Sequence, residues 1–276
     1  MPELPEVETV KRGLAPVLEG HRLIRVIARR SDLRWPLPDG FGQRLTNRQV
    51  TAVARRGKFL TIHLDDDTAW ITHLGMSGRF RVYDVDPPPE ELHDHVIAET
   101  DGGFTIRYND PRRFGFMDLT AGADLHTYPM LASMGPEPLE PEFTASILAK
   151  RLKGRIAPIK VALLDQRTVA GLGNIYVSEA LHQAGISPNR KARSLQGGRA
   201  VKLHAAIVDV LERAIEAGGS SLRDHRQPDG ELGYFQHNFF VYNRTGADCR
   251  RCGRGYPIRQ IVQSGRSTFY CPNCQR

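Results

Sequence analysis

The spacing of apolar residues divides this chain of 276 residues into a helix, a strand-rich part and a later helical part. Val7, Val10, Leu14 and Val17 recur at intervals of three or four residues, and Gly20 follows them. Apolar residues at this spacing line one face of a helix, and glycine is a common stop signal. The pattern therefore predicts one amphipathic helix near the start of the chain.

From residue 22 to about residue 117 the pattern changes to short runs rich in β-branched and aromatic residues. The clearest runs cover residues 23–27, 59–64, 69–74, 80–83, 95–98 and 104–108. Clusters of Asp, Pro and Gly separate them, as in Asp65–Asp67 and Pro87–Pro89. Many short strands punctuated by turn signals predict an antiparallel β-sandwich.

Helical spacing returns after a Pro-rich, polar stretch at residues 135–141, which predicts an interdomain linker. Three apolar stripes follow, at residues 156–163, 176–184 and 203–215. Residues 220–236 are polar and contain two glycines. A loop of this length in a compact domain is usually functional or mobile. The fold class expected is α+β, a sandwich followed by a helical domain.

All four cysteines lie near the end of the sequence, as Cys249-x2-Cys252 and Cys271-x2-Cys274 separated by 18 residues. Two such pairs match the spacing of a zinc ribbon, and four thiolates close a tetrahedral Zn²⁺ site. A reducing compartment favours metal over disulfides. The domains expected are a sandwich at 1–131, a linker at 132–150, a helical domain at 151–240 and a zinc finger at 241–276.

The net charge is +7, from 38 Lys and Arg against 31 Asp and Glu. This balance is typical of a protein that meets a polyanion. No apolar run approaches the roughly 20 residues of a membrane span, and the start lacks the pattern of a signal peptide. The composition therefore predicts a cytoplasmic protein that binds nucleic acid.

The chain starts Met1-Pro2-Glu3. The small second residue favours removal of the initiator methionine, which would turn the Pro2 nitrogen from an amide into a secondary amine. Such an amine can attack a sugar carbon and form an iminium adduct, with Glu3 beside it to move a proton. The alternative is an ordinary acidic helix start, because Pro and Glu both favour a first helical turn.

Loops of the strand-rich part carry further candidates. Lys58, on a basic turn, is a proton donor, a phosphate contact or a solvated side chain. Met76 lies between glycines and is either a wedge into the base stack or a buried residue. Arg112 and Phe114 share a turn and suit phosphate contact and base stacking, unless Phe114 packs on the sandwich. His93 is expected to contact phosphate or sugar.

Two features of the later part suit phosphate binding. Gly171–Asn174 opens a helix, where backbone N–H groups and the positive end of the dipole attract anions. Basic residues nearby are Lys153, Arg155 and Lys160. The tip of the hairpin between the cysteine pairs is expected to carry Arg259 and Arg266. An arginine there suits a DNA groove, although Arg259 is expected to face solvent.

Five motifs span the chain in order. They are residues 2–6 (PELPE), 73–78 (HLGMSG), 110–115 (DPRRFG), 173–176 (GNIY) and the four cysteines. Together they resemble the bacterial formamidopyrimidine-DNA glycosylases. The 18 residues between the cysteine pairs are slightly more than is common in that family, and this difference is expected to leave zinc and Arg266 unaffected.

The resemblance implies a sandwich with an N-terminal helix, a helix-two-turns-helix domain and a zinc finger holding one structural Zn²⁺. It implies a bifunctional glycosylase and lyase, a monomer acting at the bacterial nucleoid. Such an enzyme excises oxidised purines, 8-oxoguanine and formamidopyrimidines, from double-stranded DNA and cleaves the abasic strand by β,δ-elimination.

The roles implied are catalytic for Pro2, Glu3, Lys58 and Arg266. DNA contacts are implied for His93, Arg112, Arg155, Lys160 and Asn174. The residues that fill the gap left by the everted base are Met76, Arg112 and Phe114. The zinc ligands are Cys249, Cys252, Cys271 and Cys274, and the loop at 220–236 resembles one that caps the lesion.

Two other functions remain open from the sequence. An endonuclease VIII-like glycosylase shares this mechanism but prefers oxidised pyrimidines, and it usually has Gly where this chain has Leu4. A non-catalytic zinc-ribbon DNA-binding protein would account for the charge and the cysteines, although it gives Pro2 no role.

Overall fold

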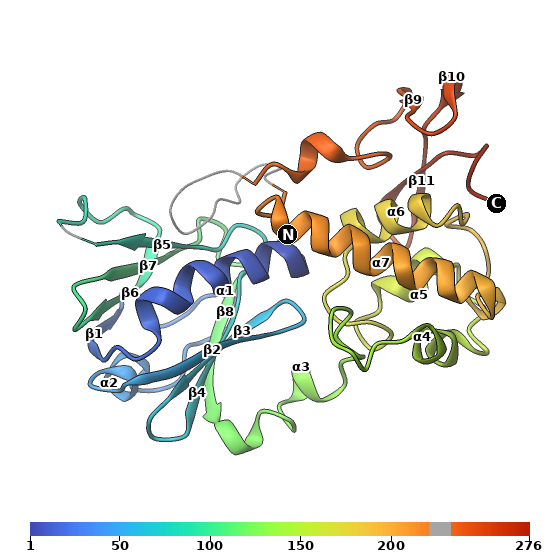
Figure 1. The fold of residues 1–276 in the computed structure, drawn as a ribbon. Helices are drawn as coiled ribbons and strands as arrows, with labels where there is room; N and C mark the ends of the chain where they lie inside the picture. Colours follow the sequence, from blue (N-terminus) through green and yellow to red (C-terminus); the bar gives the residue numbers. More distant parts are fainter. Residues whose placement is uncertain (85, 221–232) are drawn as a thin grey trace. The chain divides into compact units, whose positions relative to one another are not determined.

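The computed structural model describes residues 1–84, 86–220 and 233–276, which form two compact units (Figure 1). The first unit contains Met1–Ala132 and Ala217–Tyr234, and the second contains Ser133–Glu216 and Phe235–Arg276. Within these described ranges no helix is long and apolar enough to cross a membrane. The four-part division expected from the sequence stays a prediction.

The N-terminal helix α1 spans Leu4–Leu18 and anchors the first unit. The predicted stripe residues Val7, Val10 and Leu14 are fully buried, because they face the core that α1 shares with the sheets. Pro5 occupies the first turn, where its missing N–H has no helical partner to lose. The helix predicted from spacing is therefore confirmed.

Among the described residues of the first unit, eight strands form two four-stranded antiparallel sheets. One sheet has the order β2-β3-β4-β8 and the other β1-β6-β7-β5. The strands of the first are β2 Val50–Arg56, β3 Phe59–Leu64, β4 Thr68–His73 and β8 Phe116–Ala121. Those of the second are β1 Leu23–Ala28, β6 Asp94–Thr100, β7 Thr105–Asn109 and β5 Arg79–Tyr83.

One apolar core joins these sheets to α1, with Leu60, Trp70, Phe80 and Tyr108 among its large buried side chains. The predicted sandwich is thereby confirmed. Sequence periodicity identified six of the strands and gave no separate run for β2 or β8. The described part of the unit also contains three short helices, namely α2 Phe41–Leu45, η1 Gly122–Asp124 and α3 Pro129–Ala132.

The second unit begins with helices. They are α4 Ala145–Leu152, α5 Ile159–Leu164, α6 Asn174–Gln183, η2 Ala192–Ser194, α7 Gly198–Glu216 and η3 Phe235–Asn238. Thr144 caps α4 by accepting the Ile147 N–H at 3.2 Å, so this helix starts inside the stretch predicted as a linker. Ile156, predicted as part of a helical stripe, precedes α5 and is exposed.

Two small hairpins end the chain. Strand β9 Asp248–Cys249 pairs with β10 Gly253–Pro257, and β11 Arg259–Gln263 pairs with β12 Arg266–Tyr270. Ser264 and Gly265 join the second pair, both with positive φ, as a two-residue hairpin requires. Arg259 lies opposite Tyr270 and away from the tip, which corrects its predicted position, and its exposure agrees with the prediction that it faces solvent.

Candidate active site and nucleic-acid interface

Pro2 and Glu3 lie at the start of α1, where both are buried. The Glu3 backbone N–H donates to the Glu6 carboxylate at 2.8 Å, and the neighbouring Leu4 is fully buried. These contacts hold the start of the chain at a fixed place. Met1 precedes Pro2 here, so the Pro2 nitrogen becomes an amine only after Met1 is removed.

The surroundings of the terminal amine favour its neutral form. Burial lowers the pKa of the Met1 amino group below its ordinary value of 8.0. Glu3 and Glu6 act in the opposite direction, and the charges of Lys58 and Arg112 add to the lowering. An amine must be unprotonated to attack carbon, so this environment suits a nucleophile.

Lys58 is buried at the turn between β2 and β3, and the structure ties this turn to α1. Arg55 donates to the Gly57 carbonyl at 3.0 Å and, through Nε, to the Glu8 carboxylate at 3.0 Å. Arg55 and Arg12 lower the pKa of Glu8 in spite of its burial. The ion pair therefore fixes Lys58 relative to the helix that carries Pro2.

His73, at the end of β4, is a candidate that the sequence analysis did not single out. Its Nδ1 accepts the Gly75 N–H at 3.0 Å, so the remaining hydrogen of a neutral ring is on Nε2. Burial, with the charges of Lys58 and Arg34, lowers the pKa of His73 to about 4. A neutral ring that stacks on Phe116 is thus a fixed N–H donor in the same unit as Pro2. Its position just before a Gly-framed Met was the signal available.

Two loops present the predicted wedge residues. Met76 and Phe114 are each 43% exposed, and the Arg112 guanidinium lies over the Phe114 ring at 4.6 Å. The alternatives in which Met76 or Phe114 is a core residue are therefore wrong. The loops also interlock, because a Cβ at Gly75, where φ is +64°, would overlap the Phe114 backbone.

Asp110 is fully buried and hydrogen-bonds both of these loops. Its carboxylate accepts the Ser77 hydroxyl at 2.5 Å and the Gly115 N–H at 2.8 Å. Ser77 in turn accepts the Arg112 N–H at 3.2 Å. By accepting these hydrogen bonds, the buried Asp110 carboxylate fixes together the loop of Met76 and the loop of Phe114, which we call the wedge loops.

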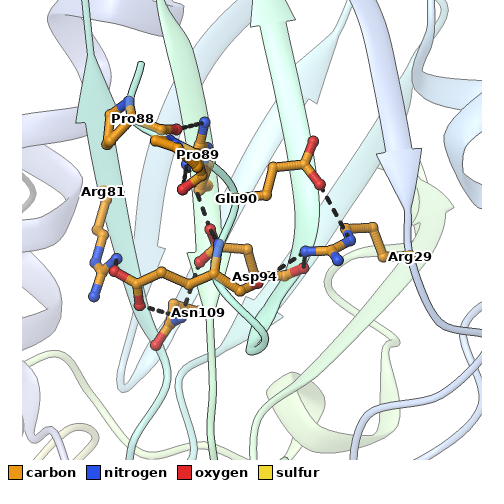
Figure 2. A network of polar contacts seen from close by, with 9 residues as sticks. Arg29, Arg81, Pro88, Pro89, Glu90, Asp94 and Asn109 are labelled. Carbon is orange, nitrogen blue, oxygen red and sulfur yellow. Dashed lines mark hydrogen bonds and ion pairs between the residues drawn. The ribbon is translucent and has the colours of Figure 1, made fainter.

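His93 is half-buried and directly precedes Asp94, which belongs to a network of polar contacts (Figure 2). Asp94 accepts hydrogen bonds from Asn109 at 2.8 Å and from the Glu91 N–H at 2.9 Å. Arg107, 3.5 Å from Asp94, donates to the Pro88 carbonyl at 2.7 Å. The Asp110 N–H donates to the His93 carbonyl at 3.1 Å. The network therefore continues to Asp110, whose carboxylate holds the wedge loops.

A cavity of about 430 Å³ adjoins the wedge residues. Half of the residues that line it are arginines, and the full set is Asp32, Leu33, Arg34, Arg112, Arg113 and Phe114. Three guanidinium groups beside an exposed aromatic ring suit a nucleic-acid backbone with an unstacked base.

In the second unit, the predicted phosphate site is the N-terminus of α6, where Gly173 is the residue before the helix and makes no side-chain cap. Asn174 Nδ2 donates to the Ser267 carbonyl at 2.9 Å. Asn174 therefore touches the hairpin at the residue next to Arg266, which is itself exposed at the start of β12.

Lys160 corrects one expectation. It is fully buried, and its ammonium group donates to the Ser267 carbonyl at 3.0 Å and to the Thr268 hydroxyl at 2.7 Å. A buried charge satisfied in this way holds the hairpin and does not reach a phosphate at the surface. Arg155 is half-exposed and pairs with Asp165 at 3.0 Å.

The four cysteines form a site whose dimensions fit one Zn²⁺. Zn–S bonds of about 2.3 Å at tetrahedral angles place sulfurs about 3.8 Å apart. The Sγ atoms of Cys249 and Cys274 are 3.9 Å apart, those of Cys252 and Cys271 are 3.7 Å apart, and all four lie within 4.8 Å. The four cysteines are therefore positioned to bind one structural zinc ion, as predicted.

The loop predicted at 220–236 lies largely outside the described residues, and its first residue is held by α1. Ser220 donates to the Glu6 carboxylate through its N–H at 2.8 Å and its hydroxyl at 2.9 Å. Glu6 also accepts the Glu3 N–H, so one buried carboxylate joins Ser220 to the residue beside Pro2.

Comparison with known proteins agrees with this arrangement. Models of the formamidopyrimidine-DNA glycosylase N-terminal domain, its H2TH domain and the zinc finger found in FPG and IleRS match residues 1–117, 134–226 and 248–276. The formamidopyrimidine-DNA glycosylases of Dinoroseobacter shibae and Rhodospirillum centenum are 54% and 55% identical to the chain, with full coverage of both sequences. The chain belongs to the formamidopyrimidine-DNA glycosylase family.

Solved structures show the same fold. The MutM (FPG) protein of Thermus thermophilus is 42% identical with a TM-score of 0.87, covering 99% of this chain and 98% of that one. The Lactococcus lactis Fpg in complex with DNA containing an abasic site is 36% identical and has a TM-score of 0.88, with 99% coverage of each chain. Membership of this glycosylase family disfavours both the pyrimidine-specific alternative and the non-catalytic zinc-ribbon alternative.

Proposed function

We propose that this chain repairs DNA by excising oxidised purines, including 8-oxoguanine and formamidopyrimidines, and then cleaving the abasic strand. The observation that carries the proposal is the buried Pro2–Glu3 pair, fixed at the start of α1 where burial and nearby cations favour a neutral terminal amine. Relatives 54% identical over their full length carry the glycosylase name, and a Lactococcus lactis neighbour is a complex with DNA containing Fapy-dG.

Base excision starts when Met1 has been removed. The Pro2 amine attacks C1′ of the everted nucleotide, and the bond from C1′ to the base breaks with the electron pair leaving on the base. Glu3 takes up the proton that the nitrogen then loses and transfers it to the ring oxygen O4′ as the sugar opens, while the departed base takes a proton from solvent. The product is a Schiff base between Pro2 and the opened sugar.

Strand cleavage uses the same adduct. The iminium acidifies the C2′ hydrogen, whose removal expels the 3′ phosphate in β-elimination, and a second elimination expels the 5′ phosphate. Lys58 acts as a proton donor in these steps. Arg266 holds a phosphate at the lesion and assists the δ-elimination. Hydrolysis of the adduct then returns the free Pro2 amine.

The remaining site residues lower the cost of eversion, which is a few kcal/mol for a stacked base. Met76, Arg112 and Phe114 fill the gap in the duplex, since all three lie on the interlocked loops that Asp110 holds. Asn174, His93 and Arg155 contact the DNA backbone. The enzyme acts as a monomer on duplex DNA in the bacterial cytoplasm, at the nucleoid.

The proposal is tested by reductive trapping on duplex DNA with 8-oxoguanine opposite cytosine. Borohydride should link protein from which Met1 has been removed, as verified by mass spectrometry, to the damaged strand. Protein that retains Met1 provides the matched control and should form no adduct, because its Pro2 nitrogen is an amide.

Glu3→Gln separates the two activities. This variant keeps the amine and should still be trapped on a preformed abasic site, whereas its excision of 8-oxoguanine should fall at least about a hundredfold, as for loss of a general acid. No adduct with either DNA, from protein lacking Met1, would show that the chain binds DNA without this chemistry.

A further inference from the structure

His182 approaches two of the zinc ligands at once. It lies near the end of α6 and is 1% exposed. Its Nε2 is 3.5 Å from the Cys249 Sγ and 3.6 Å from the Cys274 Sγ, within reach of an N–H···S hydrogen bond to each. Its ring stacks on Phe240, with centroids 5.5 Å apart and planes at 29°. The imidazole is therefore held in place between an aromatic ring and a pair of sulfurs.

The chemistry of a zinc thiolate decides which partner donates. A thiolate bound to Zn²⁺ has lost its proton and can only accept, so the hydrogen between His182 and the sulfurs is on Nε2. Four thiolates on one Zn²⁺ leave a formal charge of about −2 in a site where Cys249 and Cys271 are buried. Hydrogen-bond donors aimed at the sulfurs spread this charge.

Only some sulfurs receive such a side-chain donor among the described residues. Asn273 Nδ2 donates to the Cys252 Sγ at 3.4 Å, and His182 serves Cys249 and Cys274. Asn273 lies within the Cys271–Cys274 knuckle itself. His182 is different, because it lies on α6, outside the two Cys-x2-Cys knuckles, and joins that helix to one ligand from each of them.

The position of His182 on α6 gives this contact a second consequence. Asn174, at the opposite end of α6, donates to the Ser267 carbonyl of the hairpin at 2.9 Å. The helix thus touches the final segment beside Arg266 and again at the metal ligands. Loss of the His182 contact would remove the hydrogen bonds to the metal ligands, while Asn174 and Glu179, which accepts the N–H groups of Phe240, Val241 and Tyr242, would still join α6 to the final segment.

We propose that His182 is a positioning residue of the zinc site, which donates its Nε2 hydrogen to the Cys249 and Cys274 thiolates and so retains the metal against release and oxidation. The sulfurs carry less charge when they accept this hydrogen. They are then less easily protonated by solvent and less reactive towards peroxide, which attacks thiolates according to their electron density.

The test compares two substitutions, one that keeps the aromatic ring of His182 and one that keeps its N–H donor. His182→Phe keeps an aromatic ring against Phe240 and removes the donor. His182→Gln loses the ring and keeps an N–H donor at about the distance of Nε2 from the backbone. His204→Phe is the matched control, since His204 also contacts a phenylalanine ring in the second unit and hydrogen-bonds the Phe143 carbonyl, at 2.6 Å, away from the cysteines.

Zinc release from the whole protein is followed with a chromogenic chelator, with and without hydrogen peroxide. We expect His182→Phe to release zinc about 10- to 100-fold faster than wild type, with His182→Gln and His204→Phe close to wild type. In cobalt-substituted protein, His182→Phe should move the sulfur-to-metal charge-transfer band to longer wavelength, because an unbonded thiolate gives up its electron more easily.

Equal zinc release and equal cobalt spectra for His182→Phe and wild type would overturn the proposal. So would equally fast release from His182→Phe and His182→Gln, which would assign the effect to ring packing. The cobalt band is read on folded protein, so a variant of low stability still reports on the hydrogen bond. None of these readouts depends on glycosylase activity.

Discussion

The loops that carry Met76 and Phe114 and the hairpin that carries Arg266 present exposed side chains from rigid supports, but the supports differ. The wedge loops rest on a large apolar core and are joined by Asp110, which is fully buried. The hairpin belongs to a final segment whose apolar cluster contains only a few buried side chains, two of them cysteines. A small segment therefore relies on metal for what a large core provides by packing.

The largest effect expected from this difference follows zinc removal. Structural zinc contributes about 10–16 kcal/mol in small metal-dependent segments, so a strong chelator should unfold the hairpin. The first unit should stay folded, and its state can be read separately because both tryptophans, Trp35 and Trp70, belong to it. We expect loss of DNA binding with little change in tryptophan fluorescence. A parallel change in tryptophan fluorescence would show that the first unit also needs the metal.

The next largest effect concerns Asp110, whose carboxylate holds the wedge loops. Asp110→Ala removes the acceptor for the Ser77 hydroxyl and the Gly115 N–H and should cost about 3 kcal/mol of unfolding free energy. Excision should fall further than stability explains, because Met76 and Phe114 lose their common support. Denaturant unfolding and single-turnover excision measure the two quantities.

Asp118→Ala is the control for that substitution. Asp118 accepts the Tyr128 hydroxyl at 2.7 Å in the same unit and contacts neither wedge loop through that bond. It should cost about 1 kcal/mol and leave excision by folded protein unchanged. If both variants lose excision only in proportion to stability, Asp110 is a packing residue without influence on the wedge.

A smaller effect distinguishes Lys160, which holds the hairpin in place, from Arg266, which is proposed to contact a phosphate. Lys160→Met removes the donor to Ser267 and Thr268 and should cost about 1–2 kcal/mol. Its ammonium group is buried, so the dependence of DNA affinity on salt should keep the wild-type slope. Arg266→Ala should instead reduce that slope by about 0.9, the value for one phosphate contact. An equal reduction for Lys160→Met would restore Lys160 as a direct contact.

These contacts also show where sequence reasoning succeeds. The zinc site was predictable because ligand type and local spacing define it, and the N-terminal helix was predictable because one periodic stripe covers it. Strand β2 was not, since Ala52 and Ala54 give it little apolar contrast. The role of Lys160 was predicted wrongly, because its partners lie more than 100 residues away in the sequence. Asp110 was likewise recognised only as part of a motif, since Ser77 comes from another loop.

The smallest expected effect is a difference in pH dependence between the attack by the Pro2 amine and the binding of DNA. Burial lowers the pKa of the Met1 amine below 8.0. The Pro2 amine proposed as the nucleophile is the next residue along the chain, so the same neighbouring charges act on it. Below its pKa the amine is protonated, so the rate of borohydride trapping should fall up to about tenfold per pH unit as pH decreases. Arginine stays charged throughout, so the phosphate contacts proposed for Arg112 and Arg266 should not weaken in parallel.

Glu6→Gln sharpens this test by removing a charge that raises the pKa of the amine. The variant should shift the acid limb of the trapping profile to lower pH, because the protonated amine loses a favourable neighbour. Its Gln side chain can still accept the Ser220 N–H, which limits the structural change. Trapping and DNA affinity that fall together with decreasing pH, in wild type and variant alike, would mean that the pH dependence belongs to binding and not to the nucleophile.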